Sequence, residues 1–254
     1  MATAKQIYEY IDSIAPFETA MSFDNVGILT GSENASSDIV LVALDATNAV
    51  IEEAAENGAG IIVTHHPIIF HPLKRLGSDN PAYLAAKHDI TIISAHTNLD
   101  ISRNGVNATL SHRVGVQEAQ RFDEHCAILG SVSGYDSAAD YARHIMDTMK
   151  LPGLRFTDRG ACKRVLVSCG AGGDNIELAA AAGADTLVTG EIKHSHIMYA
   201  NDHNISVIDL GHFGSEGMIV PIVAALLAVK FPGTRFIRAG ADNDGMRYLS
   251  SDIE

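Results

Sequence analysis

Apolar residues along this chain come in short continuous runs, and helical segments rich in small residues lie between them. Residues 51–67, IEEAAENGAGIIVTHHP, predict a helix, a glycine turn and a buried strand at Ile61–Thr64 that ends in two histidines. Residues 176–192, IELAAAAGADTLVTGEI, repeat this order. Continuous apolar strands that alternate with helices are typical of a parallel sheet. The pattern therefore predicts an α/β fold.

The two segments match in sequence as well as in pattern. At a shift of 125 positions, 8 of the 14 residues from Ile51 to Thr64 are identical, and residues 40–42 align with residues 165–167. Self-similarity of this kind indicates an internal repeat. Shared α/β preferences, such as an alanine-rich helix before a glycine turn, give an alternative explanation.

A third apolar run follows in each copy, at residues 90–93 and 205–208, and just beyond it stands a histidine with an acid four residues later. These pairs are His96 with Asp100 and His212 with Glu216. Ligands in parallel α/β sheets collect at the carboxyl ends of the strands. The repeat therefore predicts two similar α/β domains with a dinuclear metal site between them. We place the first domain at residues 1–124 and 217–254, and the second at residues 125–216.

Two further helices and a tail complete the expected fold. Residues 137–149 favour a helix in the second half, and residues 215–228 favour an apolar helix that packs on the core. The segment after it, FIRAGADNDG at residues 236–245, ends in a polar stretch that is expected to be mobile.

Composition narrows the function. The formal net charge of −13 argues against a nucleic-acid partner, because such binding depends on lysine and arginine contacts to phosphates. No apolar run reaches the roughly 18 residues that a membrane span needs, and the N-terminus lacks a secretory signal. We therefore expect a cytoplasmic protein with no membrane partner. Cys126, Cys162 and Cys169 lack C-x-x-C spacing and are expected to be buried free thiols.

The histidine pair after the first repeated strand suggests metal chemistry. Adjacent side chains on an extended backbone point to opposite sides, so His65 and His66 can address two metal ions, or one can bind while the other supports it. Imidazole together with carboxylate suits Zn²⁺, Fe²⁺, Mn²⁺, Co²⁺ or Ni²⁺. A carboxylate such as Asp100 can bridge two such ions. His212 and Glu216 occupy the matching places in the second copy, and His96 is either a further ligand or a supporting residue.

Other polar residues near these positions have less certain roles. Glu191 takes the place of His66 in the second copy and is our tentative catalytic residue, either a general base or a group that orients the substrate; a structural role is equally open. His194 and His196 are expected to line the cavity. Asp24 and Asn25 either shape its rim or form an ordinary turn. The glycines of GAGGDN, residues 170–175, give only a weak phosphate-binding signal, because their spacing matches no phosphate loop.

Five motifs resemble a known family: FDNVGILTGS, VTHHPIIFHPLKRL, SAHTNLD, LVTGEIKHSH and VIDLGHFGSE. They are similar to those of the GTP cyclohydrolase 1 type 2 homologs, also called YbgI-like or NIF-three-like proteins, from about residue 5 to about residue 250. The resemblance implies two α/β domains and a toroidal homohexamer whose metal sites face an inner cavity. It also implies five ligands for two metal ions, namely His65, His66, Asp100, His212 and Glu216.

Three functions compete at this point. The first is a metal-dependent hydrolase acting on a nucleotide or related small molecule, of which GTP ring opening is one version. The second is a metal carrier or metallochaperone without turnover. The third is an interaction scaffold with a structural metal. Turnover by metal-loaded protein separates the first function from the other two.

Overall fold

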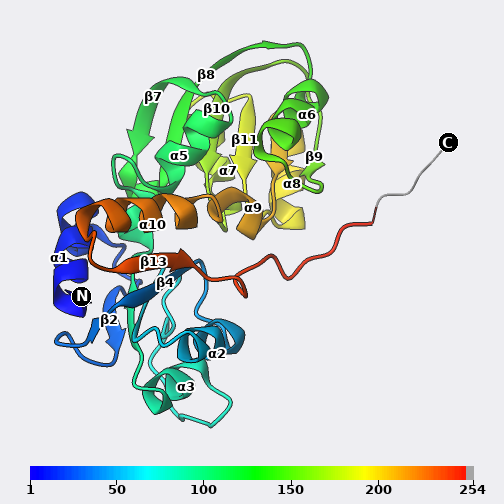
Figure 1. Cartoon of the computed structure of the whole chain (residues 1–254). Coiled ribbons are helices and arrows are strands. Elements are labelled where there is room, and N and C mark those ends of the chain that lie inside the picture. The colour runs from blue at the N-terminus through cyan, green and yellow to red at the C-terminus, as the bar shows by residue number, and fades with distance from the viewer. Residues whose placement is uncertain (250–254) are drawn as a thin grey trace. The chain divides into compact units, whose positions relative to one another are not determined.

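The computed structural model describes residues 1–249, which fall into two compact units (Figure 1). Unit 1 comprises residues 1–105 and 217–243, and unit 2 comprises residues 106–216 together with the described residues from 244 onward. The chain thus leaves unit 1, completes unit 2 and returns. The domain boundaries drawn from the sequence stay a prediction.

Unit 1 is built on a five-stranded sheet in the order β13-β4-β5-β6-β2, in which only β2 is antiparallel to its neighbour. A two-stranded antiparallel pair, β1 with β3, lies outside it. The strands are β1 (Ala2–Thr3), β2 (Gly27–Thr30), β3 (Ser36–Ser37), β4 (Ile39–Ala43), β5 (Ile61–Thr64), β6 (Thr91–Ser94) and β13 (Arg235–Arg238). The helices are α1 (Ala4–Ile14), η1 (Phe17–Thr19), α2 (Asn48–Glu56), α3 (Pro81–Lys87), α4 (Thr97–Asp100) and α10 (Ile219–Lys230).

Local sequence explains where these helices begin. Thr3 and Gln6 form a reciprocal capping box at the start of α1. The side chain of Thr47 accepts a hydrogen bond from the Val50 amide and caps α2. Asn80 caps α3 in the same way, with a proline at the first helical position. These caps set the helices that cover the apolar strands, whose buried core includes Leu41, Ile51, Ile62 and Ile92.

Unit 2 is built on a six-stranded sheet in the order β7-β8-β10-β11-β12-β9, with β10, β11 and β12 parallel. The strands are β7 (Gln117–Phe122), β8 (Ala127–Tyr135), β9 (Arg155–Phe156), β10 (Cys162–Ser168), β11 (Thr186–Thr189) and β12 (Ser206–Asp209). The helices are α5 (Val106–Arg113), η2 (Asp123–His125), α6 (Ala138–Met149), η3 (Gly172–Asn175), α7 (Ile176–Ala181), α8 (His194–Asp202) and α9 (His212–Glu216). The helix expected at residues 137–149 is confirmed, with Ser137 as its cap.

Strand pairing is equivalent in the two sheets. Val40 pairs with Ile61 in unit 1, and Val165 pairs with Thr186 in unit 2. Each residue of the second pair stands 125 positions after its counterpart in the first. The four-residue ladders end at Thr64 and Thr189 respectively. The α/β class expected from the sequence is confirmed. In both sheets, the residues singled out for chemistry follow the carboxyl ends of these strands.

The predicted C-terminal helix differs from the observed one. Instead of one helix at residues 215–228, α9 ends at Glu216, a turn follows at Gly217 and Met218, and α10 begins at Ile219. Taken together, His212–Lys230 is 19 residues long with a mean hydropathy of 1.6, enough by length and composition to cross a membrane. The sequence reading missed this stretch because a few polar residues interrupt it. Core helices pass the same test, and Ile219, Val220 and Leu227 are buried here, so the evidence for a membrane span is weak.

The segment after α10 is anchored at residues where mobility was expected. The Asp242 carboxylate accepts hydrogen bonds from the amides of Leu44 and Asp45. The Glu53 carboxylate accepts two more, from Gly240 and the residue after it. The expected mobility was wrong for residues 240–242. Their hydrogen-bond partners lie almost 200 positions earlier in the chain, and a local sequence pattern cannot reveal them.

All three cysteines are free thiols, as expected. Cys162 and Cys169 are buried, while Cys126 is partly exposed. Burial raises the pKa of the Cys162 thiol to about 11, with the charges of Asp185 and Asp158 adding to the effect against a hydrogen bond from Thr186. A thiol in such an environment is unreactive at neutral pH.

Candidate metal centre

Three imidazoles gather at the carboxyl ends of two neighbouring strands in unit 1. His65 and His66 follow β5, and His96 follows β6. Their ring centroids are 5.0 to 5.5 Å apart. One nitrogen of each ring can be chosen so that all three atoms lie within 4.8 Å of one another. The described residues of unit 1 therefore include a group able to hold a metal ion.

The tautomer of His65 is fixed by a backbone carbonyl. Its Nδ1 lies 2.9 Å from the oxygen of Ala95, which can only accept a hydrogen bond. Nδ1 therefore carries a proton, and in the neutral ring Nε2 keeps the lone pair that a metal requires. This Nε2 lies 3.4 Å from Oδ1 of Asp100, whose residue is only 6% exposed. The ring and the carboxylate thus present ligand atoms side by side.

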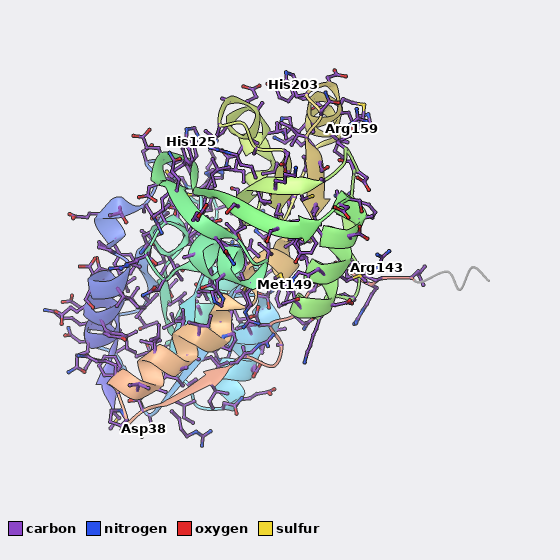
Figure 2. The ribbon with its side chains drawn as sticks, turned by 90° about the horizontal axis from the view of Figure 1, so that it is seen from above. Asp38, His125, Arg143, Met149, Arg159 and His203 are labelled. Carbon is purple, nitrogen blue, oxygen red and sulfur yellow. The ribbon has the colours of Figure 1, made fainter. Side chains whose placement is uncertain are left out.

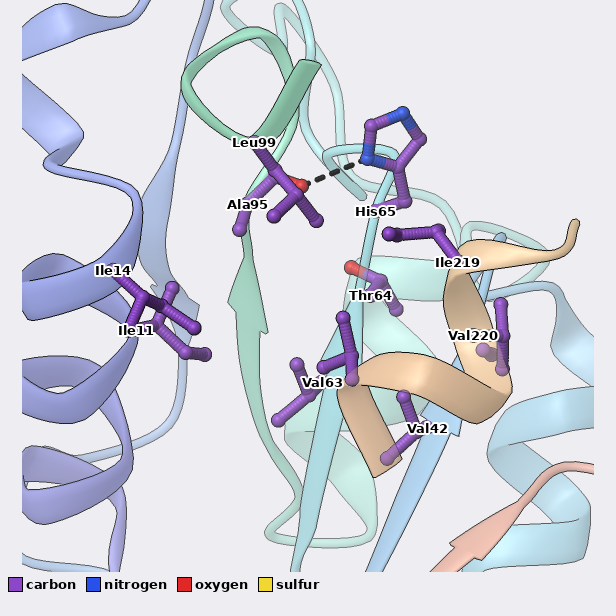
Figure 3. Close-up of a pocket in the computed structure, with 12 residues that line it drawn as sticks. Ile11, Ile14, Val42, Val63, Thr64, His65, Ala95, Leu99, Ile219 and Val220 are labelled. Carbon is purple, nitrogen blue, oxygen red and sulfur yellow. Dashed lines mark hydrogen bonds between the residues drawn. The ribbon is translucent and has the colours of Figure 1, made fainter. Parts of the chain in front are cut away.

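An apolar cavity of about 20 Å³ lies beside His65 (Figure 3). Its lining includes Ile11, Val42, Val63, Leu99, Ile219 and Val223. Such a space has room for about one water molecule but offers it almost no polar partner. Hydrocarbon therefore packs on this side of His65, and the ring is held with Nε2 on its polar side.

His66 is oriented by a carboxylate. Its Nδ1 lies 2.8 Å from Oδ1 of Asp45, which follows β4 in the same sheet. A carboxylate behind a metal-binding histidine fixes the tautomer and makes the opposite nitrogen more basic. Asp45 was not among the residues predicted from the sequence. The rule that ligands collect at the carboxyl ends of strands would have pointed to it, since it stands two residues beyond Ala43.

His96 has the same arrangement with a different partner. Its Nδ1 lies 2.9 Å from Oδ1 of Asp24, whose side chain is fully buried. Burial alone would raise the pKa of Asp24, but hydrogen bonds from His96 and Thr97, and the charge of His96, outweigh it and lower the pKa to about 2. Asp24 is therefore ionised at neutral pH and accepts the Nδ1 proton of His96. Asp24, considered from sequence as a rim or turn residue, supports this ring.

Unit 2 carries a second cluster at the ends of β11 and β12. His212 Nδ1 lies 2.7 Å from Oε1 of Glu191, and its Nε2 lies 3.1 Å from Oε2 of Glu216. The two residues of the latter pair are four positions apart in α9 and share one face of the helix. Glu216 is 2% exposed, whereas the side chains of His212 and Glu191 reach solvent. Glu191 thus contacts His212, and its assignment as a catalytic residue stays a prediction.

Glycines make room for the Glu216 cluster. A Cβ at Gly170 would overlap Oε1 of Glu216 and lie 3.2 Å from Nε2 of His212. The Gly170 amide donates to the Ser215 hydroxyl, which donates to the carbonyl of His212. Gly190 lies against the same hydroxyl. From the sequence, Gly170 carried only a weak signal for phosphate binding. In the structure it packs against α9 instead, where it contacts Ser215 and Glu216.

Replacing Gly170 with alanine is expected to displace Glu216 and reduce metal binding. The position has φ +54°, so strain of about 1–2 kcal/mol adds to the overlap. Gly183→Ala is the matched control, because φ is +70° but nothing lies within 4 Å of a Cβ there. Thermal melting and metal analysis of both variants test the idea. Equal melting temperatures and equal metal contents would contradict it.

His194 and His196 stand at the start of α8. His194 is exposed. His196 Nδ1 lies 3.3 Å from Oδ1 of Asp174, which also accepts from the Lys193 ammonium at 2.9 Å. The structure thus brings Glu191 to His212 but gives His196 a different carboxylate. The role of His194 and His196 in lining a cavity stays a prediction.

Comparison with known sequences gives one consistent result. The family model for Duf34/NIF3 (NGG1p interacting factor 3) matches residues 2–241. A GTP cyclohydrolase 1 type 2 homolog of Clostridium acetobutylicum is 29% identical over 238 residues, covering 88% of each chain. Another from Campylobacter jejuni is 32% identical over 217 residues, covering 83% of this chain and 86% of the relative. The resemblance drawn from the five motifs is confirmed.

Solved structures agree. Staphylococcus aureus protein SA1388 is similar with a TM-score of 0.86 and 25% identity, over 98% of this chain and 99% of that one. A Bacillus cereus protein related to NIF3 gives a TM-score of 0.86 at 20% identity, over 98% and 99% of the two chains, and supports the fold alone.

Proposed function

The chain belongs to the Duf34/NIF3 family, and on that premise we propose that it is a dinuclear metal-binding protein that acts as a metal-dependent hydrolase. The substrate class is a nucleotide or a related small molecule. The proposed cofactors are two divalent transition-metal ions from the set Zn, Fe, Mn, Co and Ni. The proposed ligands are His65, His66, Asp100, His212 and Glu216.

One observation carries the metal proposal. His65, His66 and His212 each have Nδ1 engaged by a carbonyl or carboxylate oxygen, at 2.7 to 2.9 Å. This is the arrangement that orients metal-binding histidines, because it leaves Nε2 as the ligand atom of every ring. His203 makes a similar Nδ1 contact with the Tyr199 carbonyl, so the arrangement alone does not identify a ligand. In His65 and His212 it is combined with a buried carboxylate near Nε2, Asp100 and Glu216 respectively.

The donor set also fits the proposed ions. Imidazole nitrogens with carboxylate oxygens suit transition metals rather than a magnesium cage. Asp100 and Glu216 are both buried, and a buried carboxylate is costly unless cationic or hydrogen-bonding groups compensate its charge. Divalent cations would add to the compensation that His65 and His212 give these carboxylates.

Hydrolysis follows from what these groups do together. Two bound ions supply Lewis-acid activation of water and of the bond under attack. Asp45 and Glu191 hold His66 and His212 in place. His96 lies beside His65 and His66 and is held by Asp24, which supports a role as a further ligand or as a residue that supports the ligands. The nucleotide class is supported by the name of the relatives, GTP cyclohydrolase 1 type 2 homolog.

A metal carrier without turnover is the second candidate. Its support is exposure: the Glu191 side chain is about half exposed, and that of His212 reaches solvent beside it. A carrier needs ligands that solvent or a partner can reach, whereas a purely structural metal is usually enclosed.

Metal analysis followed by a substrate screen tests the proposal. Protein purified without chelators is expected to carry up to about two transition-metal ions per chain. GTP and other nucleotides are then offered to the metal-loaded protein and to the chelator-treated protein. Turnover that needs the metal supports the hydrolase, metal without turnover supports the carrier, and protein that takes up no metal contradicts both.

We also propose that the two units descend from an internal repeat. The support is that strand pairs β4–β5 and β10–β11 align equivalent residues at the shift of 125. His96 and His212 likewise both follow the third strand of their copy of the repeat, β6 and β12, by two or three residues. The proposed domains remain residues 1–124 with 217–254, and residues 125–216.

Assembly into a cytoplasmic, toroidal homohexamer is a further proposal, and light scattering tests it. Its support is the apolar surface of α10, where Val229 is 84% exposed and Leu226 is 39% exposed. Exposed apolar surface of this kind marks contacts between chains. A mass near six times 27.0 kDa is expected at micromolar concentration. A stable monomer under those conditions would count against it.

A further inference from the structure

Two phenylalanines in unit 1 stand exposed beside the three imidazoles. Phe23 is 64% exposed and Phe70 is 37% exposed, and their ring centroids are 6.3 Å apart. Phe70 also lies 6.1 Å from the ring of His96. Exposed aromatic surface next to a polar cluster is a feature of binding sites. We call Phe23 and Phe70 the aromatic pair.

The backbone that carries the aromatic pair is fixed by buried polar contacts. Asp24, the residue after Phe23, binds the amide and hydroxyl of Thr97 as well as His96. The Asn25 side chain donates to the carbonyl of Ile69, the residue before Phe70, at 2.5 Å. The two loops are therefore tied to each other and to the turn that carries His96. Their position is built into the fold, although the rings themselves face solvent.

A flat ligand fits between the two rings only after the Phe23 side chain rotates. A ring stacked between two others needs about 3.5–4.0 Å on each side, or roughly 7–8 Å between the outer centroids. The rings of the pair are tilted by 53° and their centroids are 6.3 Å apart, which is closer than this, so the proposal requires the exposed Phe23 side chain to turn outward. Side-chain rotation at the surface is fast and costs little.

The surroundings favour a ring with heteroatoms. The His96 ring lies 6.1 Å from the Phe70 ring, nearly perpendicular to it, and beside His65 and His66. A ring stacked on Phe70 therefore lies close to the imidazoles and can turn one edge toward them. Nitrogen or oxygen atoms on that edge find hydrogen-bond partners there, whereas the edge of a hydrocarbon ring finds none. An aliphatic ligand would gain no stacking from the phenyl faces.

We propose that Phe23 and Phe70 clamp a flat heteroaromatic ring of the substrate, with its polar edge turned toward His96. This inference rests on the proposed function, since it names the residues that select the substrate of that same site. The aromatic pair recognises the ring of the substrate, and the imidazoles beside it belong to the proposed metal centre.

The test uses the full chain and the fluorescent nucleoside 2-aminopurine riboside, whose emission is quenched on stacking. Binding is titrated with zinc-loaded and with chelator-treated protein. Phe23→Leu and Phe70→Leu, which keep an apolar side chain but remove the flat face, are each expected to weaken binding about ten-fold. Tyr83→Leu, another exposed aromatic of unit 1, is the matched control and is expected to bind as the parent does. Ribose alone is expected not to compete.

Several results would overturn the clamp. The clamp is contradicted if Phe23→Leu and Phe70→Leu bind the probe as tightly as the parent does. It is also contradicted if Tyr83→Leu weakens probe binding as much as they do. If Phe23→Leu instead abolishes self-association in sedimentation while probe affinity stays the same, the patch is a contact between copies of the chain. Circular dichroism and metal content identify a variant that has failed to fold, and Phe23→Tyr, which keeps a flat ring, is then expected to retain binding. Probe binding that survives chelation supports the clamp even if the metal proposal fails.

Discussion

Protein in which both His65 and His212 are replaced by alanine is expected to contain almost no bound metal, against about two ions per chain in the parent. The two residues lie in different units, and each presents Nε2 toward a buried carboxylate, Asp100 for His65 and Glu216 for His212. Removing both imidazoles takes a nitrogen donor from each cluster. Metal analysis at matched protein concentration measures the effect.

The control for this experiment also changes one histidine in each unit. His88 pairs at 3.8 Å with Glu52 near the surface of unit 1, and His203 is exposed in unit 2 (Figure 2). His88→Ala with His203→Ala is expected to leave metal content unchanged. Full metal content in the His65 and His212 double variant would reject the ligand assignment. Loss of metal in the control would show that the change is not specific to the proposed site.

Loss of the Asp100 carboxylate is expected to abolish any metal-dependent turnover found in the substrate screen. Asp100 is buried and lies 3.4 Å from His65 Nε2, so it is the acid of unit 1 best placed to share a metal ion. Even residues that only support metal ligands cost about 10- to 100-fold in affinity or activity when changed. A ligand should cost at least about 100-fold. Initial rates of metal-loaded Asp100→Ala, compared with the parent, measure the effect.

Asp100→Asn complements the alanine variant because it keeps the shape of the side chain and removes the charge. If both variants fold and both lose turnover, the carboxylate itself is required. Asp38→Ala is the matched control, since Asp38 is an exposed acid of unit 1 (Figure 2). Parent-like rates in both Asp100 variants would remove Asp100 from the reaction, whatever its contribution to folding.

Much of the candidate site could be predicted from sequence, because a short apolar run and the polar residues after it mark where a strand ends. The apolar run IIVT has the bounds expected for β5, and the HHP that follows must lie at its carboxyl end. The histidine and acid four residues apart in α9 share a helix face, as their spacing requires. The family, too, was evident from five short motifs.

The partners of those residues could not be predicted in the same way. Asp24 and His96 are 72 positions apart, and Asp45 and His66 are 21 apart. No periodicity links such pairs, because a hydrogen bond between loops depends on how the strands beneath them are ordered in the sheet. The anchoring of the tail by Asp242 could not be predicted for the same reason.

The sequence by itself therefore determined the fold class, the main strands and the residues with metal-binding chemistry. Apolar runs and turn residues act through local conformational preference and burial, which are readable along the chain. Tertiary structure alone decided which nitrogen of each histidine is presented, that Gly170 seats Glu216, and that Phe23 stands beside Phe70. Those outcomes depend on contacts between distant segments, and such contacts exist only once the strands have paired and the loops have closed over their ends.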